Sequence, residues 1–130
     1  MKALFIGGTG TISTAISQLC VQLGWELTLL NRGTHRERMP EGVEQIAADM
    51  NDRADVQAKL AGRRFDVVAD FIAFTVDQVE RDIQLFSGKT AQYFFISSAS
   101  AYQKPLSSPF ITESTPLSNP FWQYSRDKIA

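Results

Sequence analysis

The chain has 130 residues, 44% hydrophobic and 21% charged, and this length predicts one globular domain that buries roughly two-thirds of its unfolded surface. Its 13 basic and 14 acidic residues give a net charge of -1, so it has no basic footprint for nucleic acid or an anionic membrane. The single cysteine cannot form an internal disulfide, and no apolar run is long enough to span a membrane. We therefore expect a cytoplasmic protein, with no membrane as a partner and with nucleic acid disfavoured.

The first third of the chain alternates between strand and helix patterns. Ala3–Ile6 is a short apolar run before two glycines, as expected of a buried strand, and Trp25–Leu30 is a second such run. Between them, apolar residues recur at intervals of three and four, which predicts an amphipathic helix. The segment Arg32–Gly42 is polar and predicts a loop. The apolar face expected to pack on the core comprises Ile12, Ala15, Ile16, Leu19, Cys20 and Leu23.

The alternation continues through the middle of the chain. Val43–Ala47 predicts a third strand and Asp55–Leu60 a short helix, while Asp66–Phe74 (DVVADFIAF) predicts a strong fourth strand. A further helix follows and ends before Gly88. Its expected apolar face comprises Val76, Val79, Ile83 and Phe86.

The last third predicts one more strand and then a long connection. Gln92–Ile96 is a fifth strand, Tyr102–Pro120 is a loop that holds four of the five prolines, and Phe121–Ala130 begins a final helix. Strands that alternate with helices predict right-handed crossovers and a parallel sheet. We expect a Rossmann-type, doubly wound α/β sheet of about five strands in the order 3-2-1-4-5.

The stretch IGGTGTIS lies where this fold binds a dinucleotide, between the first strand and the first helix. Gly7 allows a tight turn, Gly10 lets the backbone approach a pyrophosphate, and the helix N-terminus offers free N–H groups. The alternative is a glycine turn without a nucleotide. The preceding strand and the following helix favour the nucleotide site. No ligand pattern for a metal is present.

Tyr124 and Lys128 are four residues apart, so they share one face of the final helix. An ammonium beside a phenol favours the phenolate and lowers a pKa that is normally about 10. The pair is therefore a candidate for proton transfer near neutral pH. The alternative is that both are ordinary helix residues.

Three motifs together resemble the extended, epimerase/dehydratase-like branch of the short-chain dehydrogenase/reductase superfamily. GGTGTIS is similar to its GxxGxxG turn, with Gly7, Gly10 and Ser13 at the motif positions. FFISSASAY is similar to the segment that carries the family's catalytic serine, which falls on Ser98. YSRDK matches YxxxK through Tyr124 and Lys128.

The resemblance implies an NAD(P)-dependent enzyme acting on a nucleotide sugar or a similar small hydroxyl or carbonyl substrate. Tyr124 would exchange a proton with the substrate oxygen, Ser98 would hydrogen-bond the same oxygen, and Lys128 would bind the nicotinamide ribose. The turn would hold the cofactor through Gly7, Gly10, Thr11 and Ile12.

The chain departs from this branch after the fourth strand. The branch has an asparagine there that supports a proton-relay water, but no asparagine occurs between Phe71 and Gly88. The role is vacant or falls to Gln78 or Gln84. Asp70, inside an apolar run, needs a partner and is either a polar contact near the cofactor or a structural hydrogen-bond acceptor.

Residues after the second strand favour NADP over NAD. An acidic residue normally accepts the ribose hydroxyls of NAD, but here Asn31 and Arg32 take its place, and the guanidinium suits a 2′-phosphate. Arg36 and Arg38 either add positive charge there or, the interpretation we favour, lie in a solvated loop. Asp49 is either an adenine contact or a helix N-cap.

Family members continue well beyond YxxxK, so the chain resembles the N-terminal part of one, an incomplete domain over residues 1–130 without the substrate-binding part. We expect such a fragment to be inactive. We also expect either homo-oligomers through the free side of the fifth strand, or disorder from about Ser107 onward that displaces Tyr124 from the serine. A different class stays open: a non-catalytic nucleotide-binding regulator or an RNA-binding relative of the same fold.

Overall fold

A parallel sheet of five strands forms the centre of the protein, seen here in a computed structural model that describes residues 1–130. Neighbouring strands follow the order β3-β2-β1-β4-β5, and each pair is parallel. This confirms the doubly wound α/β fold expected from the sequence. The strands are β1 (Lys2–Ile6), β2 (Glu26–Asn31), β3 (Glu44–Ala47), β4 (Phe65–Asp70) and β5 (Thr90–Phe95).

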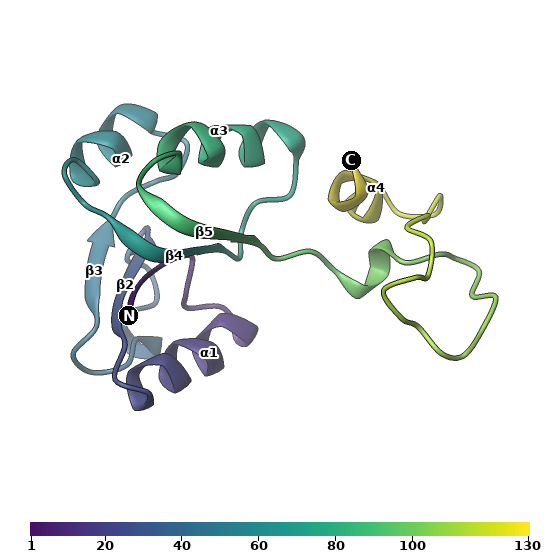
Figure 1. The fold of residues 1–130 in the computed structure, drawn as a ribbon, viewed down its shortest axis with the longest axis horizontal. Coiled ribbons are helices and arrows are strands. Elements are labelled where there is room, and N and C mark those ends of the chain that lie inside the picture. The colour runs from purple at the N-terminus through teal and green to yellow at the C-terminus, as the bar shows by residue number, and fades with distance from the viewer.

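Helices cover both faces of the sheet. One face carries α1 (Thr11–Gln22), and the other carries α2 (Arg53–Lys59) and α3 (Val76–Phe86) (Figure 1). A short 3-10 turn, η1 (Arg36–Arg38), lies in the loop after β2. No helix has the length and apolar character that crossing a membrane requires.

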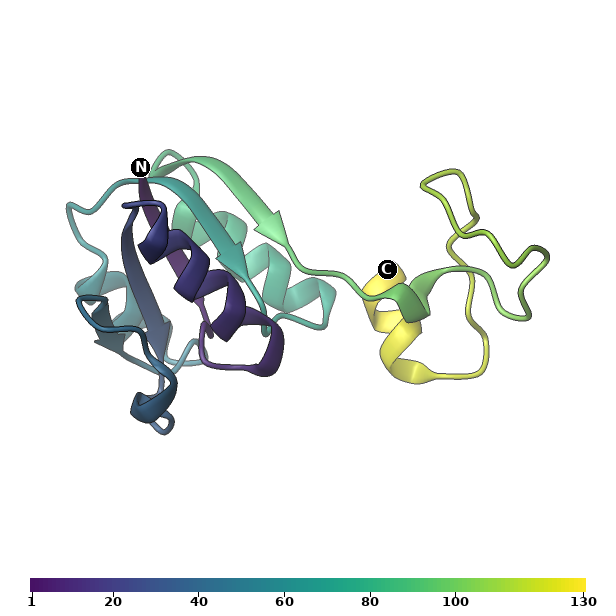
Figure 2. The ribbon, with the colours of Figure 1, turned by 90° about the horizontal axis from the view of Figure 1, so that it is seen from below.

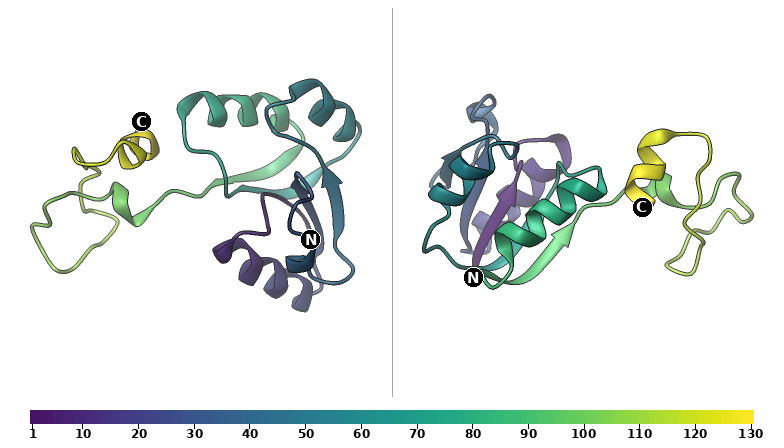
Figure 3. Two further views of the ribbon diagram at one scale, coloured as in Figure 1. Left: turned by 180° about the vertical axis from the view of Figure 1, so that it is seen from behind. Right: turned by 90° about the horizontal axis from the view of Figure 1, so that it is seen from above.

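The chain after β5 leaves the sheet and forms an arm at its side (Figures 2 and 3). The arm contains a 3-10 turn, η2 (Ala99–Ala101), a long loop and the final helix α4 (Gln123–Ile129). Tyr102 and Leu117 form an isolated antiparallel bridge that draws the two ends of the loop together. The arm thereby returns α4 toward the ends of β4 and β5.

Alternating side chains on β1 fill a core on each face of the sheet. Leu4 and Ile6 belong to a cluster of 11 buried residues that includes Phe86 of α3. Ala3 and Phe5 belong to a cluster of 6 buried residues that includes Cys20 of α1. Successive side chains of a strand point to opposite faces, so a central strand covered on both sides must be apolar throughout.

The apolar face predicted for α1 is wrong except at Cys20. The buried residues of α1 are Ser13, Ser17 and Cys20. Ser17 Oγ donates to the Gly8 carbonyl at 3.2 Å, so the helix turns its small polar side chains toward the glycine turn and the sheet. The four large apolar residues of the predicted face are exposed on the opposite side: Ile12, Ile16, Leu19 and Leu23.

The face predicted for α3 is also wrong in part. Phe86 is buried as expected, but Val76 and Ile83 are exposed. Arg81 and Asp82 are buried instead, and they form an ion pair of 2.8 Å. Arg81 and Asp82 neutralise each other, and Tyr93 of β5 donates to Asp82, so this charged pair can face the sheet. The spacing of apolar residues alone therefore gave the wrong buried face for this helix.

The strand predicted over Asp66–Phe74 is too long, because β4 ends at Asp70. Asp70 Oδ1 accepts the backbone N–H groups of Ile72 at 2.6 Å and Ala73 at 2.7 Å. These bonds turn the chain although apolar residues continue. The Asp70 side chain competes locally with the hydrogen bonds between strands, which the apolar run conceals. The structural alternative for Asp70, a hydrogen-bond acceptor, is confirmed.

Gly8→Ala tests how closely the glycine turn approaches β2. A Cβ at Gly8 would lie 2.5 Å from Leu29 Cδ2, and its φ of +77° already disfavours a side chain. We expect a loss of about 3 kcal/mol or more in the free energy of unfolding, from backbone strain together with overpacking. Chemical denaturation measures it.

Gly24→Ala is the matched control, because Gly24 has φ +73° with no atom within 4 Å of the added Cβ. It should cost only the backbone term of about 1–2 kcal/mol. Equal losses in the two variants would contradict a close approach at Gly8.

Candidate functional site

The glycine turn between β1 and α1 is shaped to accept a ligand against its backbone. Gly7 and Gly8 both adopt positive φ, and Gly10 is the N-cap of α1. Ser13 Oγ accepts the Gly10 N–H at 2.9 Å and is buried beneath the turn. Serine thus fits the position of the third motif glycine and also closes the turn, a role that the motif itself does not reveal.

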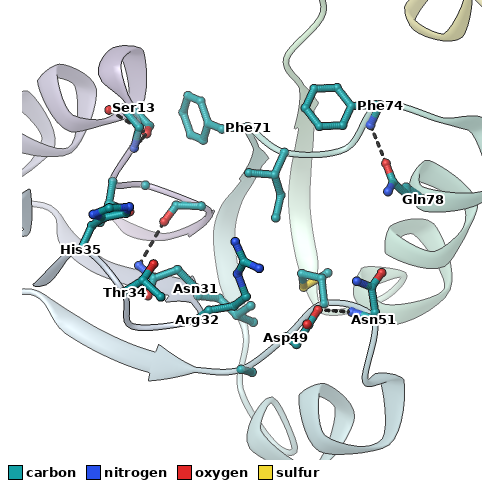
Figure 4. A pocket seen from close by; sticks show the side chains of 18 of the residues that line it. Ser13, Asn31, Arg32, Thr34, His35, Asp49, Asn51, Phe71, Phe74 and Gln78 are labelled. Carbon is teal, nitrogen blue, oxygen red and sulfur yellow. Dashed lines mark hydrogen bonds between the residues drawn. The ribbon is translucent and has the colours of Figure 1, made fainter. Parts of the chain in front are cut away.

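A cavity of about 530 Å³ opens beside this turn at the carboxyl ends of β1, β2 and β4. Its wall includes turn backbone, polar side chains after β2 and β3, and aromatic rings after β4 (Figure 4). The N–H groups of Thr11 and Ile12 belong to the first turn of α1, where no intrahelical acceptor exists. Backbone donors without a side chain in front of them fit the diphosphate of a dinucleotide.

Asn31 lies in this wall, but its amide is engaged within the protein. Its Nδ2 donates to the Gly7 carbonyl at 3.1 Å, and its Oδ1 accepts Gly33 N–H at 2.8 Å and Gln45 Nε2 at 2.7 Å. Asn31 therefore fastens the end of β2 to the glycine turn. The cofactor contact predicted for Asn31 stays a prediction, and nothing in the sequence indicated that the hydrogen bonds of this residue hold the turn.

Two arginines line the cavity. Arg32 is exposed, reaches toward the middle of the cavity (Figure 4) and forms no hydrogen bond or ion pair with the protein. Arg38 also lines it, and its Nη1 donates to the Thr9 carbonyl at 3.4 Å. Arg38 is exposed, as expected of a loop residue, but η1 also folds it back toward the turn, which leaves open that it adds positive charge beside the cavity.

Asp49 follows β3 and lines the opposite part of the cavity. Its Oδ1 accepts Asn51 N–H at 2.9 Å, which leaves its second carboxylate oxygen free. The helix cap is Asp52, whose Oδ1 accepts Asp55 N–H at 3.1 Å. The N-cap alternative for Asp49 is therefore wrong, and its carboxylate remains available to a ligand.

A second cavity of about 230 Å³ joins the glycine turn to the arm. It shares Gly10, Ser13, Phe71 and Phe74 with the larger cavity, and Tyr124 and Lys128 form its far wall. The structure thus brings the glycine turn, near the N-terminus, and the YxxxK motif, near the C-terminus, to the walls of one cavity. Ser98 does not line it, but the preceding residue Ser97 does.

Lys128 is held at the base of the second cavity. Its ammonium donates to the carbonyls of Ala73 at 2.5 Å and Ile96 at 2.8 Å, and it lies 4.4 Å from the centroid of the Phe95 ring. Burial lowers the pKa of Lys128, and the charge of Asp70 partly opposes this shift. The ammonium lies 5.9 Å from the Tyr124 ring centroid.

Tyr124 packs between aromatic neighbours. Its ring centroid is 5.6 Å from that of Phe74 and 4.7 Å from that of Trp122, and no hydrogen bond engages its hydroxyl. Stacking fixes the ring while the hydroxyl stays available. Such a phenol can exchange a proton with a ligand in the second cavity.

The two glutamines considered for the missing asparagine lie in different places. Gln84 is exposed on the outer side of α3, where its Oε1 accepts Arg53 Nη1 at 3.2 Å. Gln78 lines the larger cavity, and its Oε1 accepts Phe74 N–H at 2.6 Å. Only Gln78 is placed near the candidate site, and its oxygen is already committed to the start of α3.

A buried polar cluster lies behind the aromatic turn. Asp82 accepts Arg81 at 2.8 Å through Oδ1 and Tyr93 Oη at 2.8 Å through Oδ2. Asp70 Oδ2 is fully buried without a hydrogen-bond partner, and the nearest cation, Arg81 Nη2, is 3.9 Å away. Burial, reinforced by the hydrogen bonding and the charge of Asp82, raises the pKa of Asp70 to about 7.

Comparison with known proteins identifies the family. The sequence model of the NAD dependent epimerase/dehydratase family matches residues 3–130. The chain belongs to this family. The resemblance drawn from the glycine turn, the serine segment and YxxxK is therefore confirmed, as is the NAD(P)-binding Rossmann fold.

Solved relatives share the fold at low sequence identity. A UDP-glucose 4-epimerase from Thermus thermophilus, in complex with NAD, matches with a TM-score of 0.83 at 20% identity over 99% of this chain and 48% of its own. The UDP-glucose 4-epimerase from Bifidobacterium longum, in complex with NAD+ and UDP, matches with a TM-score of 0.83 at 18% identity over 99% and 46%.

A curated relative is more similar in sequence. The chloroplast stem-loop binding protein of 41 kDa b from Arabidopsis thaliana is 32% identical over 116 residues, which are 79% of this chain and 30% of that protein. The chain therefore spans less than half the length of the epimerase structures and less than a third of the plant protein.

Asp70→Asn tests the buried carboxyl. The pKa of Asp70 is higher in the folded state than its ordinary value of 3.8, so the folded state holds this proton more tightly than the unfolded chain. The stability due to the proton is complete below about pH 4 and is lost as pH rises to about 7. We expect the variant, neutral at every pH, to be more stable at pH 8 by about 1–3 kcal/mol.

Denaturation curves at pH 5 and pH 8 measure this effect, and the gain should shrink at pH 5. Asp66→Asn, at the exposed opposite end of β4, is the control and should leave the pH dependence unchanged. An Asp70→Asn chain that is no more stable than the wild type at pH 8 would contradict the assignment.

Proposed function

We propose that this chain is the nucleotide-binding part of an NAD(P)-dependent epimerase, dehydratase or reductase that acts on a nucleotide sugar or a similar hydroxyl or carbonyl substrate. The observation that carries the proposal is the shared wall of the two cavities. One end is the glycine turn, and the other holds Tyr124 and Lys128. A dinucleotide along this path would extend from the polar side chains after β2 and β3 to the phenol of α4.

Each group in this path has a distinct role in the proposal. The turn backbone, with Thr11 and Ile12, binds the diphosphate, while Asp49 and Arg32 bind the adenosine portion. Lys128 binds the nicotinamide ribose, and a bound nicotinamide supplies a hydride acceptor or donor. Tyr124 exchanges a proton with the substrate oxygen, and Ser98 donates a hydrogen bond to that oxygen.

Lys128 already donates two of its three N–H groups within the protein, which limits how it can bind a ribose. Its ammonium donates to two backbone carbonyls, so ribose hydroxyls must either replace one of these acceptors or take its third N–H. The lowered pKa of Lys128 makes the ammonium easier to deprotonate than an exposed one. Its position within the aromatic cluster is consistent with a cation that acts on Tyr124 from a short distance.

The complete protein carries the proposed activity. Because the chain spans less than half the length of the UDP-glucose 4-epimerase structures, we propose that residues outside 1–130 select the substrate. The 130 residues alone should bind nucleotide without sustained turnover.

A second candidate is a nucleotide-binding protein that also contacts RNA, favoured by the name of the plant relative. The net charge of -1 argues against it, since phosphate contacts require basic side chains. Fluorescence anisotropy with a labelled RNA stem-loop at 150 mM salt separates the two. Tight, salt-dependent RNA binding would favour this candidate over the enzyme.

Arg32→Ala tests the preference for NADP. We expect the wild-type chain to bind NADP more tightly than NAD, because the free Arg32 guanidinium faces the cavity without a protein partner. Loss of one charged hydrogen-bonding group should weaken NADP binding about tenfold or more and leave NAD binding nearly unchanged. Calorimetric titration of both nucleotides measures this.

Arg36→Ala is the matched control, because Arg36 lies in the same loop after β2 as Arg32 but does not line the cavity. It should leave both affinities unchanged. NAD affinity equal to or above that for NADP in the wild type would overturn the preference.

Tyr124→Phe tests the acid–base assignment in the complete protein. Phenylalanine keeps the packing against Phe74 and Trp122 but removes the hydroxyl. We expect kcat on UDP-glucose or a related nucleotide sugar to fall about 10²–10⁴-fold, with nucleotide affinity unchanged.

Tyr102→Phe is the control, since Tyr102 lies in the arm at the bridge to Leu117 and outside both cavities. It should retain full activity. If Tyr124→Phe keeps activity within a few-fold of the wild type, another group transfers the proton.

A further inference from the structure

A chain of hydrogen-bonded side chains leads from Ser98 into the interior of the arm. Ser98 Oγ lies 2.9 Å from Ser100 Oγ, and Ser125 Oγ donates to Ser100 Oγ at 2.9 Å. Asn119 Nδ2 donates to Ser125 Oγ at 3.3 Å. Ser125 is completely buried and Asn119 nearly so. Three separate segments, the serine turn, the long loop and α4, supply these four residues.

The direction of this chain is fixed at its buried end. Asn119 Oδ1 accepts the Phe121 N–H at 3.1 Å, so the other side-chain atom must be the amide nitrogen. That nitrogen donates to the Ser100 carbonyl at 2.8 Å and to Ser125 Oγ. An amide nitrogen only donates, so Ser125 accepts from Asn119 and gives its own proton to Ser100.

The same order then reaches Ser98. Ser100 Oγ accepts from Ser125. Either hydroxyl could donate across the 2.9 Å contact between Ser98 and Ser100, but the Ser100 proton has no other acceptor in the protein, which favours its donation to Ser98 Oγ. The backbone N–H of Ser100 also donates to Ser98 Oγ, at 3.2 Å. Both lone pairs of Ser98 are thereby used, and its own proton has no acceptor in the protein.

We propose that Ser100, Ser125 and Asn119 are positioning residues that fix the hydroxyl of Ser98 as a hydrogen-bond donor toward the substrate oxygen. Ser98 lines neither cavity but directly follows Ser97, which lines the second one. Ser125 and Asn119 also lie outside both cavities and farther along the hydrogen-bonded chain, so they act only through Ser98. The catalytic meaning of this order rests on the proposed function, whereas the order of the hydroxyl protons does not.

The chemistry of the proposed reaction needs this direction. A substrate carbonyl that receives a hydride develops negative charge on oxygen, and a fixed donor stabilises that charge. A serine free to rotate would sometimes present a lone pair to the same oxygen. Each donor in the chain also polarises the next hydroxyl, which makes Ser98 a stronger donor.

Neutron diffraction from deuterium-exchanged crystals tests the order directly, without any activity. We expect the Ser125 deuterium to point to Ser100, the Ser100 deuterium to Ser98, and the Ser98 deuterium away from Ser100. A Ser98 deuterium between Ser98 and Ser100 would overturn the proposal. In Ser125→Ala, Ser100 Oγ loses the donor that occupies one of its lone pairs, so acceptance from Ser98 becomes more favourable and the Ser98 deuterium should turn toward Ser100.

Kinetics of the complete protein test the consequence. Ser125→Ala should lower kcat on a nucleotide-sugar substrate about tenfold while KM and nucleotide affinity stay unchanged, and Ser125→Thr, which keeps a hydroxyl, should restore kcat. Asn119→Asp removes the amide donor at nearly constant shape and should lower kcat similarly. A merely structural role would lower stability in these variants without this split between kcat and KM.

The two levels of the proposal fail in different ways. If Ser98→Ala retains full kcat, the catalytic assignment of Ser98 in the proposed function is wrong, although the neutron result still decides the hydroxyl order. If Ser98→Ala loses activity but Ser125→Ala does not, the positioning role is overturned and the proposed function stands.

Discussion

The carboxyl group of Asp70 links the sheet to the arm that carries Tyr124 and Lys128. Its Oδ1 ends β4 by accepting the N–H groups of Ile72 and Ala73. The turn that follows presents the Ala73 carbonyl to Lys128 and the Phe74 ring to Tyr124. The backbone of Asp70 acts in the same direction, because its carbonyl accepts the Ile96 N–H at 3.1 Å where β5 leaves the sheet. Without this turn, the contacts of Ala73 and Phe74 would no longer fix Lys128 and Tyr124 relative to the glycine turn.

Burying two carboxyl groups next to this turn costs electrostatic free energy. Asp70 and Asp82 are both completely buried, and only Arg81 lies close enough to balance their charge. Arg81 pairs with Asp82, while burial and the nearby charge of Asp82 raise the pKa of Asp70 to about 7. A buried carboxyl with an unsatisfied oxygen is a common feature of functional sites, where polar groups are placed for geometry rather than for stability. Here that geometry is the turn between the two cavities.

The arm is held to the rest of the protein by polar contacts together with the packing of Phe74 against Tyr124. Lys128 reaches back to the carbonyls after β4 and β5, and within the arm Asn119 and Ser125 tie the loop to η2 and α4. Large apolar side chains of the arm, among them Phe110, Phe121 and Trp122, stay exposed. Hydrogen bonds are directional and apolar contacts are not, so this segment is positioned for angle and distance more than for burial.

Sequence patterns alone were enough to predict the sheet, its strand order, the glycine turn and the family. These follow from local signals: apolar runs of strand length, glycines at fixed spacing, and a Tyr–Lys pair one helical turn apart. It did not determine which face of α1 is buried, because small serines fit the close approach to the turn where the larger Ile12 and Leu19 cannot. Nor did it reveal that Asp70 ends its strand, that Arg38 returns to the cavity, or that Asn119 meets Ser100 and Ser125. The contacts of Arg38 with Thr9 and of Asn119 with Ser100 join residues that are distant in the chain, so only tertiary packing brings them within hydrogen-bond range. The bonds of Asp70 are local, but the apolar run around it conceals them. The spacing of apolar residues predicts whether a segment is a helix or a strand, whereas the face that it buries depends on the shape of the surface against which it packs.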